Sequence, residues 1–336
     1  MTADVAGIQS LLEPIRKLHD SIRDAVVQAC EQQGSEQLAV AAGDDGDTIY
    51  AIDRVAEGAL LRGIDALAQR EPIVLVAEGL PGGSVVLPHG AGDPECRWRL
   101  LVDPVDGTRG LMYQKRSAWI LTGVAPNRGD ATRLSDIALA VQTEVPLLKQ
   151  HLSDQLWATR GNGFEARRHN RLSGASEPLT LRPSRADTIE HGFATVVRFF
   201  PGAGEVLGAI EDALTGSLVQ AAPGRAACFE DQYASTGGEL YELIAGHDRF
   251  VADLRPLVNP TGLCCHPYDL CTALIALEAG VVLADPERGP VDAPFDVKSD
   301  VAWVGCANAR LWSSIEPVLQ SALSRRGLLG RRRQPK

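Results

Sequence analysis

LVDPVDGTRG, residues 101–110, places two aspartates, a proline and a glycine at the end of an apolar run typical of a buried strand. Pro104 fixes its own φ angle and has no N–H group, which stiffens the segment, and Gly107 lets the backbone approach a ligand closely. Two interpretations are open at this point. The segment is either a tight turn between two strands, or a site at which Asp103 and Asp106 bind a ligand.

The bulk properties are those of a folded protein with an acidic surface. The chain has 336 residues, of which 45% are hydrophobic and 23% charged, and this length predicts a large two-part domain or two packed domains. A net charge of −10 argues against a non-specific nucleic-acid binder, whereas a small phosphorylated substrate remains compatible with a bound metal ion. We interpret the basic stretch 325–336 as a solvated tail, with a nucleic-acid or membrane contact as the alternative.

The seven cysteines have no spacing typical of a disulfide framework. The first residues lack the pattern of a signal peptide, and no apolar run reaches about 18 residues. We therefore predict a cytoplasmic protein with reduced thiols and no membrane contact. The stretch CCHPYDLC (264–271) offers three cysteines and a histidine to zinc, but adjacent cysteines are poor co-ligands and no second cluster follows.

The first half of the chain predicts helices followed by strands. Apolar residues recur at helical spacing over 7–33 and 51–69, with a Gly/Asp-rich loop over 43–48 between them. Strands are predicted at 72–79 and 97–107, both of which end in acids. Further strands are predicted over 118–125 and 136–145, and a hairpin over 154–166 that turns at Gly161, Asn162 and Gly163.

From about residue 181 strands and helices alternate, which is typical of α/β layering. This alternation comes from the segments 192–200, 203–216, 237–254 and 267–285. We therefore divide the chain into an N-terminal α+β half (1–180), a C-terminal α/β half (181–320) and a basic, flexible tail (321–336).

Five acids occupy strand ends or helix starts, where side chains of layered α/β folds converge on ligands. They are Asp53, Glu78, Asp103, Asp106 and Asp269. Carboxylates gathered together repel one another unless a cation binds them, and oxygen ligands favour Mg²⁺ or Mn²⁺. Each acid also has a plainer interpretation. Asp269, for example, would cap a helix over 269–280 that ends at Gly280.

Four segments together resemble the inositol monophosphatase-like superfamily in order and spacing. They are AIDRVAE (51–57), VAEG (76–79), LLVDPVDGT (100–108) and YDLCTALIALEAGVVLAD (268–285), and the resemblance extends over about residues 10–320. It implies an α/β (α+β) fold, a layered αβαβα sandwich of the inositol monophosphatase and fructose-1,6-bisphosphatase type. It also implies a Mg²⁺-dependent, often Li⁺-sensitive phosphatase. Inositol phosphates, 3′-phosphoadenosine 5′-phosphate, histidinol phosphate and fructose 1,6-bisphosphate are substrates in that superfamily, and homodimers are common.

The resemblance assigns metal ligands residue by residue. Glu78, Asp103 and the backbone carbonyl of Val105 would hold a first metal ion, and Asp103, Asp106 and Asp269 a second. The expected cofactor is Mg²⁺, with Mn²⁺ as the alternative ion.

The resemblance also assigns the groups that act on water and phosphate. Asp53 and Thr108 match the pair that orients and deprotonates the attacking water. The N–H groups of Gly107 and Thr108, together with Arg109, would receive the phosphate of a small phosphorylated substrate. A covalent mechanism of the haloacid-dehalogenase type needs an aspartate two residues before Asp106, and that position is Pro104.

This sequence departs from the family pattern at several positions. Gly79 replaces a second acid, Tyr268 replaces a tryptophan, and Gly262 stands where an acid grips inositol hydroxyls. These departures leave the substrate open more than the reaction. Gly79 also motivates an alternative, a non-catalytic relative that binds a metal or ligand.

The segment 109–119, RGLMYQKRSAW, is unlike the family pattern as well. Its basic residues Arg109, Lys115 and Arg116 would either contact a second anionic group of the substrate or lie in a solvated loop.

Overall fold

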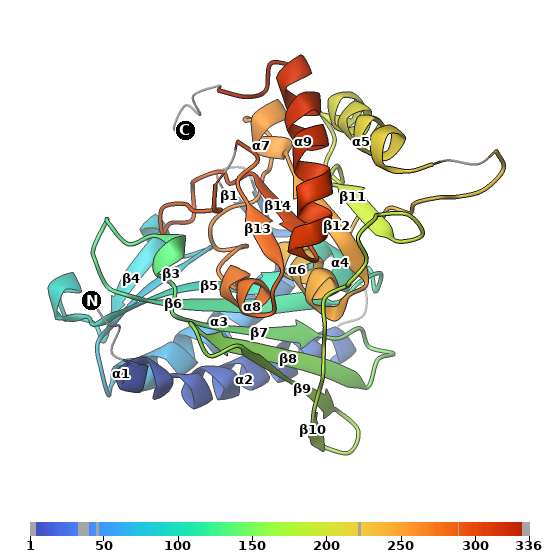
Figure 1. Cartoon of the computed structure of the whole chain (residues 1–336). Coiled ribbons are helices and arrows are strands. Elements are labelled where there is room, and N and C mark those ends of the chain that lie inside the picture. Colours follow the sequence, from blue (N-terminus) through green and yellow to red (C-terminus); the bar gives the residue numbers. More distant parts are fainter. Residues whose placement is uncertain (1–4, 33–39, 45–46, 221–222, 288, 331–336) are drawn as a thin grey trace.

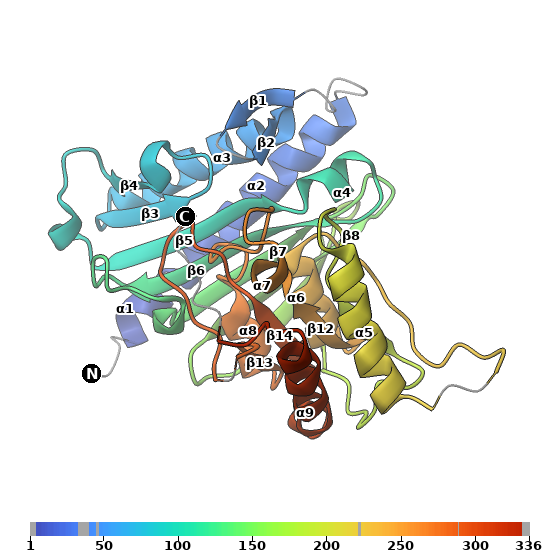
Figure 2. The same ribbon diagram turned by 90° about the horizontal axis from the view of Figure 1, so that it is seen from above.

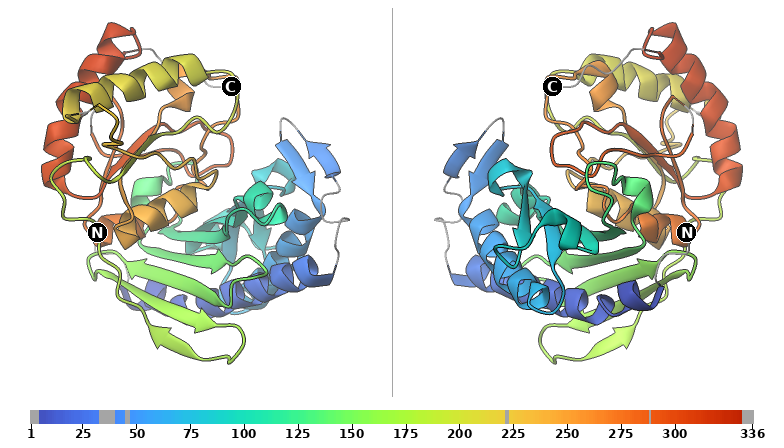
Figure 3. Two further views of the ribbon diagram at one scale, coloured as in Figure 1. Left: turned by 90° about the vertical axis from the view of Figure 1, so that its right-hand side faces the viewer. Right: turned by 90° about the vertical axis from the view of Figure 1, so that its left-hand side faces the viewer.

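The computed structural model of the chain describes residues 5–32, 40–44, 47–220, 223–287 and 289–330, and its elements stack in five layers. Helices α2 and α3 cover one face of an eight-stranded sheet, and α6 and α8 lie between that sheet and a four-stranded sheet. Helices α5 and α9 lie side by side on the outer face of the smaller sheet (Figures 1 and 2). The end-on views of Figure 3 show the two outer helical layers on opposite sides of the molecule. The predicted αβαβα sandwich is confirmed.

The long helix predicted over 7–33 is divided into α1 (Val5–Gln9) and α2 (Leu12–Gln32). Pro14 lies in the first turn of α2, where it has no N–H to offer the carbonyl of Ser10, and its ring excludes a helical turn before it. The next helix, α3, extends over Ala51–Ala68 with Asp53 in its first turn, close to the prediction.

The eight-stranded sheet has the order β10-β9-β8-β7-β6-β5-β3-β4. Its strands are β3 (Ile73–Ala77), β4 (Ser84–Leu87), β5 (Trp98–Asp106), β6 (Ala118–Pro126), β7 (Leu139–Val145), β8 (Leu152–Thr159), β9 (Phe164–Asn170) and β10 (Ser176–Pro178). Strands β3 and β5 pair in parallel, with Ala77 opposite Val102, and the other pairs are antiparallel. The two strands that end in acids therefore end at the same edge of the sheet.

The hairpin prediction is confirmed, and the loop prediction is partly wrong. β8 and β9 pair across a turn in which Glu278 accepts hydrogen bonds from the N–H groups of Gly161 (2.7 Å) and Gly163 (2.8 Å). In the segment predicted as a loop over 43–48, β1 (Val40–Asp44) and β2 (Asp47–Tyr50) form an antiparallel pair. Its central residues 45–46 lie outside the described part of the chain.

The second half supplies the smaller sheet and its helices. The sheet has the order β11-β12-β14-β13. Its elements are β11 (Phe193–Val196), β12 (Asp248–Asp253), β13 (Val282–Ala284), β14 (Trp303–Cys306), α5 (Gly204–Leu218), α6 (Thr236–Ala245), α8 (Ala273–Glu278) and α9 (Ala309–Arg325). Two short helices, α4 (Thr108–Met112) and α7 (Arg255–Val258), follow β5 and β12.

Three predicted boundaries in this region differ from the structure. The strand predicted over 192–200 ends at Val196, and the helix predicted from Asp269 begins at Ala273. Residues 321–325, placed in the tail, form the end of α9, and Leu328 packs in the core beneath it. Residues 331–336 lie outside the described part.

An apolar core fills each space between successive sheet and helix layers. The middle core joins Trp119 of β6 to Trp303 of β14, so both halves of the chain contribute to it. None of the helices in the described ranges combines the length and the apolarity needed to cross a bilayer.

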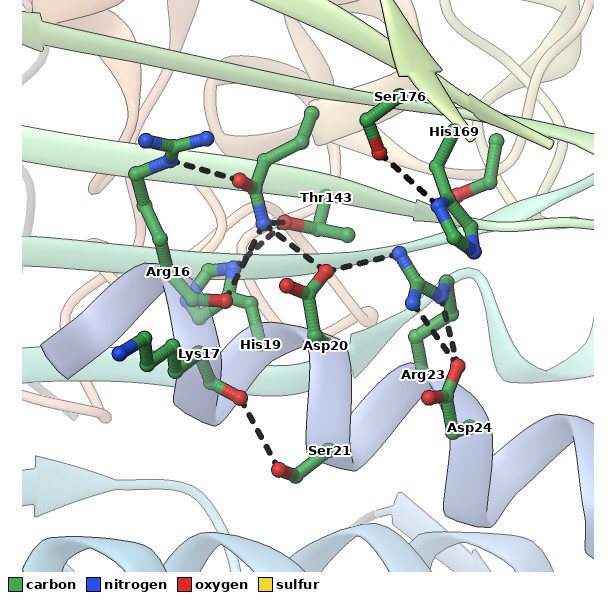
Figure 4. Close-up of polar contacts among 12 residues, drawn as sticks. Arg16, Lys17, His19, Asp20, Ser21, Arg23, Asp24, Thr143, His169 and Ser176 are labelled. Carbon is green, nitrogen blue, oxygen red and sulfur yellow. Dashed lines mark hydrogen bonds and ion pairs between the residues drawn. The ribbon is translucent and has the colours of Figure 1, made fainter. Parts of the chain in front are cut away.

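A polar layer lies between α2 and the larger sheet, on the face away from the middle helices (Figure 4). His19 is fully buried there, with Nε2 2.8 Å from Thr122 Oγ1 and Nδ1 3.0 Å from Thr143 Oγ1. Burial lowers the pKa of His19 to about 3, so the imidazole is neutral and joins the two threonines as a neutral hydrogen-bonding group. These bonds fix the position of α2 against β6 and β7.

Candidate active site

The motif at the end of β5 forms an irregular, rigid turn. Asp103 lies opposite Leu121 of β6, and the register shifts before Asp106, which leaves Pro104 in a bulge where its missing N–H disrupts no ladder. The N–H of Val105 donates to Asp103 Oδ1 at 3.0 Å, which orients that carboxylate. Both aspartates are buried.

Gly107 is required by the geometry of this turn. Its φ angle is +92°, a conformation that residues with a side chain rarely adopt. A Cβ there would also lie 3.0 Å from Ser235 Cβ, so a side chain would push the end of β5 away from α6. The turn interpretation and the site interpretation are therefore compatible, because the stiff turn presents the aspartates.

Three carboxylates converge at this turn. One oxygen each of Asp103, Asp106 and Asp269 lies within 4.8 Å of the others, in an arrangement that could hold a metal ion. Burial raises the pKa of all three, to about 6 for Asp106, and the neighbouring acids raise the pKa of Asp103 and Asp269 further. Carboxylates that are close together and shielded from water need a cation to ionise together. The donor set therefore fits a hard divalent ion, whereas the buried cysteines 264, 265 and 271 are not members of this group.

Asp269 has a local role different from the predicted helix cap. It lies in a series of turns before α8, and its Oδ2 accepts a hydrogen bond from the N–H of His266 at 2.6 Å. Thr272, the residue that precedes α8, makes no side-chain cap bond. The carboxylate thus closes an upstream turn, which directs it to the other two acids.

Thr108 and Asp53 meet as a pair beside the three acids. Thr108 Oγ1 lies 2.8 Å from Asp53 Oδ1 and 2.9 Å from the carbonyl oxygen of Val105. A hydroxyl has one proton, so Thr108 donates to one of these oxygens at a time. Asp53 comes from the first turn of α3 in the outer layer, and Thr108 begins α4 directly after the motif.

The first turn of α6 holds Asp106 in place, and our sequence predictions do not include it. Ser235 Oγ and the N–H of Gly237 donate to Asp106 Oδ2 at 2.8 and 2.6 Å, and Ser235 also accepts from the N–H of Gly238 as the helix cap. A Cβ at Gly237 would lie 2.6 Å from Leu121 Cδ2 and 3.1 Å from Asp106 Oδ2, so a larger residue would displace the side chains around Asp106. The serine three residues before Gly238 was a readable cap signal, but its second bond to Asp106 joins positions 129 residues apart.

Gln142 of β7 joins two of the segments that carry the acids. It is fully buried, its Nε2 donates to the carbonyl of Gly237 at 2.7 Å, and its Oε1 accepts from Thr272 Oγ1 at 2.9 Å. Gly237 in turn donates to Asp106, and Thr272 lies three residues after Asp269. The Gln142 amide therefore helps to set the distance between the Asp106 and Asp269 carboxylates through the backbone segments that carry or support them.

We expect Gln142→Met to weaken binding of Mn²⁺ about 10-fold, since removing the support of a ligand typically costs 10- to 100-fold in metal affinity. Titration followed by electron paramagnetic resonance of free Mn²⁺ measures this directly. Gln155→Met is the matched control, because Gln155 is a buried glutamine on the α2 face of the sheet and bonds to Arg16 and Thr143. Both variants should have a lower free energy of unfolding in urea than the wild type. Equal Mn²⁺ affinity in both would contradict the role of Gln142.

The three acids line a cleft. Its empty volume is about 1090 Å³, which includes solvent space at the open mouth. All the predicted site residues line it. They are Asp53, Glu78, Asp103, Val105, Asp106, Gly107, Thr108, Arg109 and Asp269. Glu78 is exposed and raises the pKa of Asp103, but it does not belong to the group of three converging carboxylates. Lys115 and Arg116 are not among the lining residues, and Arg116 pairs with Asp231 instead.

Gly79, the position without the second acid, has a carboxylate beside it. Its φ angle is +81°, and a Cβ there would lie 3.7 Å from Glu57 Oε2. Glu57 lies one helical turn after Asp53 and lines the cleft, although the sequence predictions did not single it out.

No family model and no curated protein sequence matches this chain. Solved structures do match it over nearly its whole length. A hypothetical protein from Pyrococcus horikoshii, described as having similarities to inositol-1 monophosphatase, is 14% identical with a TM-score of 0.62, and the match covers 92% of this chain and 98% of that one. The extragenic suppressor protein SuhB from Bartonella henselae is 16% identical with a TM-score of 0.65 and coverages of 93% and 98%.

Fructose-1,6-bisphosphatase from Leishmania major is 12% identical with a TM-score of 0.67 and coverages of 94% and 93%. At these identities the likeness concerns the arrangement of the backbone. It agrees with the five layers and with the resemblance seen in the four sequence segments. The chain therefore has the fold of the inositol monophosphatase-like superfamily, which fructose-1,6-bisphosphatase shares.

Proposed function

We propose that this protein is a Mg²⁺-dependent phosphatase that hydrolyses a small phosphomonoester by direct attack of water. The observation that carries the proposal is the convergence of the buried Asp103 and Asp106 and the partly buried Asp269 beside the hydrogen-bonded pair Thr108 and Asp53. These five residues come from β5, α4, α3 and the turn before α8, and each has a plainer structural role that does not explain their meeting.

The assignment of ligands follows the resemblance. Glu78, Asp103 and the carbonyl of Val105 would hold one ion, and Asp103, Asp106 and Asp269 would hold another, with Mn²⁺ as an alternative to Mg²⁺. When bound, these ions would neutralise charge on the phosphoryl oxygens and lower the pKa of water. Glu57 adds a carboxylate at the wall where Gly79 has none, which supports a cation-binding wall there.

The protein's own groups would move the proton of the attacking water. A proton passes from the water to Thr108 Oγ1 while the hydroxyl proton of Thr108 passes to Asp53 Oδ1, across the 2.8 Å contact. The water oxygen forms a bond to phosphorus as the ester P–O bond breaks, and the departing alkoxide takes a proton from solvent. The N–H groups of Gly107 and Thr108, with Arg109, would hold the phosphate, and all three residues line the cleft.

The substrate classes proposed are inositol phosphate-like compounds, sugar phosphates and 3′-phosphonucleotides. Gly262 does not favour myo-inositol phosphate, and a Cβ at this position would lie 2.5 Å from Asn259 Nδ2, which leaves no room for an acidic side chain without rearrangement. The division into halves at residue 180, a homodimer and a cytoplasmic location stay predictions from the sequence.

A panel of phosphomonoesters tests this function. We expect the purified protein to release inorganic phosphate from at least one of inositol phosphate, sugar phosphates, 3′-phosphoadenosine 5′-phosphate and histidinol phosphate when Mg²⁺ is present. EDTA should abolish the release and excess Mg²⁺ should restore it. A folded protein that binds Mg²⁺ and releases phosphate from none of them would instead be the non-catalytic relative.

A further inference from the structure

The three converging acids Asp103, Asp106 and Asp269 form what we call the acidic floor of the cleft. The cleft also has an aromatic wall, which we define as Phe199, Phe200 and the adjoining Leu263. Phe199 and Phe200 follow β11 in a loop, and their rings meet edge to face with centroids 4.9 Å apart. Both rings are partly exposed. The proposed phosphatase function gives this wall no role, because it assigns the metal ions to the acids, the water to Thr108 and Asp53, and the phosphate to Gly107, Thr108 and Arg109.

Arg255 holds the aromatic wall from behind. Its guanidinium carbon lies 4.5 Å from the ring centroid of Phe199 and 5.1 Å from that of Phe200, within the range of cation–π contacts. The same guanidinium donates to the carbonyl of Leu263 at 3.2 Å. One cation thus contacts all three members of the wall, which fixes their relative positions before a ligand arrives.

Arg255 itself is committed to the protein and does not serve as a receptor for a second phosphate. It is 6% exposed, and its Nε and Nη2 donate to the two oxygens of Asp253 at 2.9 and 2.6 Å. Asp253 is fully buried, so the guanidinium is needed to neutralise it. The wall therefore offers a ligand apolar ring surface and no net charge.

A polyol would find few partners at this wall. None of the three members of the wall has a polar side chain, and among the described residues that line the cleft there is no asparagine, glutamine or lysine. The polar residues of the lining lie outside the wall as defined, and apart from the carboxylates and Arg255 they are Thr108, Arg109, Ser235, Thr236, His266 and Tyr268. Hydroxyl groups placed against phenyl rings would lose hydrogen bonds to water without replacement. A planar ring, in contrast, gains edge-to-face or offset contacts with Phe199 and Phe200.

We propose that the alcohol part of the substrate carries a planar unsaturated ring, and that this ring packs against Phe199 and Phe200 while the phosphate lies over the acids. This inference rests on the proposed function, since it describes the leaving group of that reaction. The substrate class is a phosphomonoester of an aryl- or heteroaryl-bearing alcohol.

A comparison of benzyl phosphate with cyclohexylmethyl phosphate tests directly whether the cleft prefers a planar unsaturated ring to a saturated one. Both are primary phosphomonoesters of similar size, and the saturated ring has the larger apolar surface, so a merely hydrophobic wall would favour the cyclohexyl compound. We expect kcat/KM to favour benzyl phosphate by roughly 2- to 10-fold, the scale of aromatic pair contacts beyond burial. A ratio of one or below in the wild-type protein would overturn the proposal.

Two variants connect the ratio to the wall. Phe200→Leu should bring the ratio of the two kcat/KM values towards one. Phe229→Leu is the matched control, because Phe193 and Phe229 form another exposed aromatic pair, with centroids 5.7 Å apart, outside the lining of the cleft. Its ratio should equal that of the wild type, and an equal change in both variants would contradict the assignment.

Binding separates this inference from the proposed function. Benzylphosphonate and cyclohexylmethylphosphonate, which cannot lose phosphate by the same reaction, are titrated into the Mg²⁺-loaded protein by calorimetry. Tighter binding of benzylphosphonate supports the proposed packing of a planar ring against Phe199 and Phe200, even if no ester is hydrolysed. In that case only the phosphatase function fails. If both esters are hydrolysed and both phosphonates bind with equal affinity, the proposed ring packing is wrong and the phosphatase function is supported.

Discussion

Replacing Asp106 by asparagine is expected to lower Mg²⁺-dependent phosphate release at least about 100-fold, because the loss of one metal ligand removes several kcal/mol of charge stabilisation in the transition state. Asparagine has the same shape, and its amide oxygen can accept the bonds that Ser235 and Gly237 donate to Asp106 Oδ2. The fold should therefore persist. Initial rates at saturating Mg²⁺, together with Mn²⁺ affinity, measure the effect.

The metal-free stability of the same variant should change in the opposite direction. Burial raises the pKa of Asp106 to about 6 from its usual 3.8, so the folded protein binds more protons than the unfolded chain between about pH 4 and pH 6. Stability from this group is present at low pH and is lost as pH rises through about 6. Without metal, Asp106→Asn should thus be at least as stable as the wild type at pH 8 in urea unfolding.

Asp154→Asn is the control for losing a buried aspartate. Asp154 is 2% exposed, pairs with Arg168 and Tyr241, and lies outside the cleft lining. We expect it to destabilise the protein and to leave Mn²⁺ affinity at the wild-type value. Retention of most activity in Asp106→Asn, or equal losses of affinity in both variants, would contradict the metal assignment.

Replacing Thr108 by valine should reduce kcat by 10²- to 10⁴-fold, the usual contribution of a positioned proton-transfer group. Valine keeps the shape of threonine and removes the hydroxyl that lies 2.8 Å from Asp53 Oδ1. Unlike Asp106→Asn, this variant keeps every carboxylate of the proposed metal centre, so Mn²⁺ affinity should stay within about 3-fold of the wild type. Steady-state kinetics and Mn²⁺ titration on the same preparation separate the two roles.

Thr159→Val provides the matched comparison. The Thr159 hydroxyl is also buried and hydrogen-bonded, to Gln9 Oε1 at 3.1 Å, but it belongs to β8 outside the cleft lining. Its kcat should be close to that of the wild type. If Thr108→Val lost no more activity than Thr159→Val, Thr108 would have no part in moving the proton of water.

The parts of the fold that depend on local pattern were predictable from the sequence. β5 was recognisable because a continuous apolar run ends in acids, and the β8–β9 hairpin because Gly161 and Gly163 permit its turn. The division between α1 and α2 was also readable, since a proline fits only the first turn of a helix and Pro14 therefore predicts a helix that begins just before it, but helical periodicity outweighed this signal in our prediction. The cap role predicted for Asp269 was wrong, because aspartate is equally suited to cap a helix and to accept a hydrogen bond that closes an upstream turn.

The parts of the site that depend on tertiary packing were not predictable. Asp106 meets Ser235 and Gly237 only because α6 packs against β6. The number of residues between them in the sequence does not predict that they are in contact. Phe199 and Phe200 read as the continuation of a strand, because large apolar residues have that propensity. The strand ends at Val196, however, and the two rings turn to Arg255 in the cleft.

The origin of the acids in both halves of the chain has a consequence for folding. Asp103 and Asp106 belong to the larger sheet, whereas Asp269 and the α6 contacts belong to the segment between the sheets. The three carboxylates meet only after these layers dock, so a cation that binds all three would stabilise the docked state and not either layer alone. At a cation concentration 100 times the dissociation constant this linkage amounts to about 2.7 kcal/mol. The bound ion would then make the unfolding of the two sheets more cooperative.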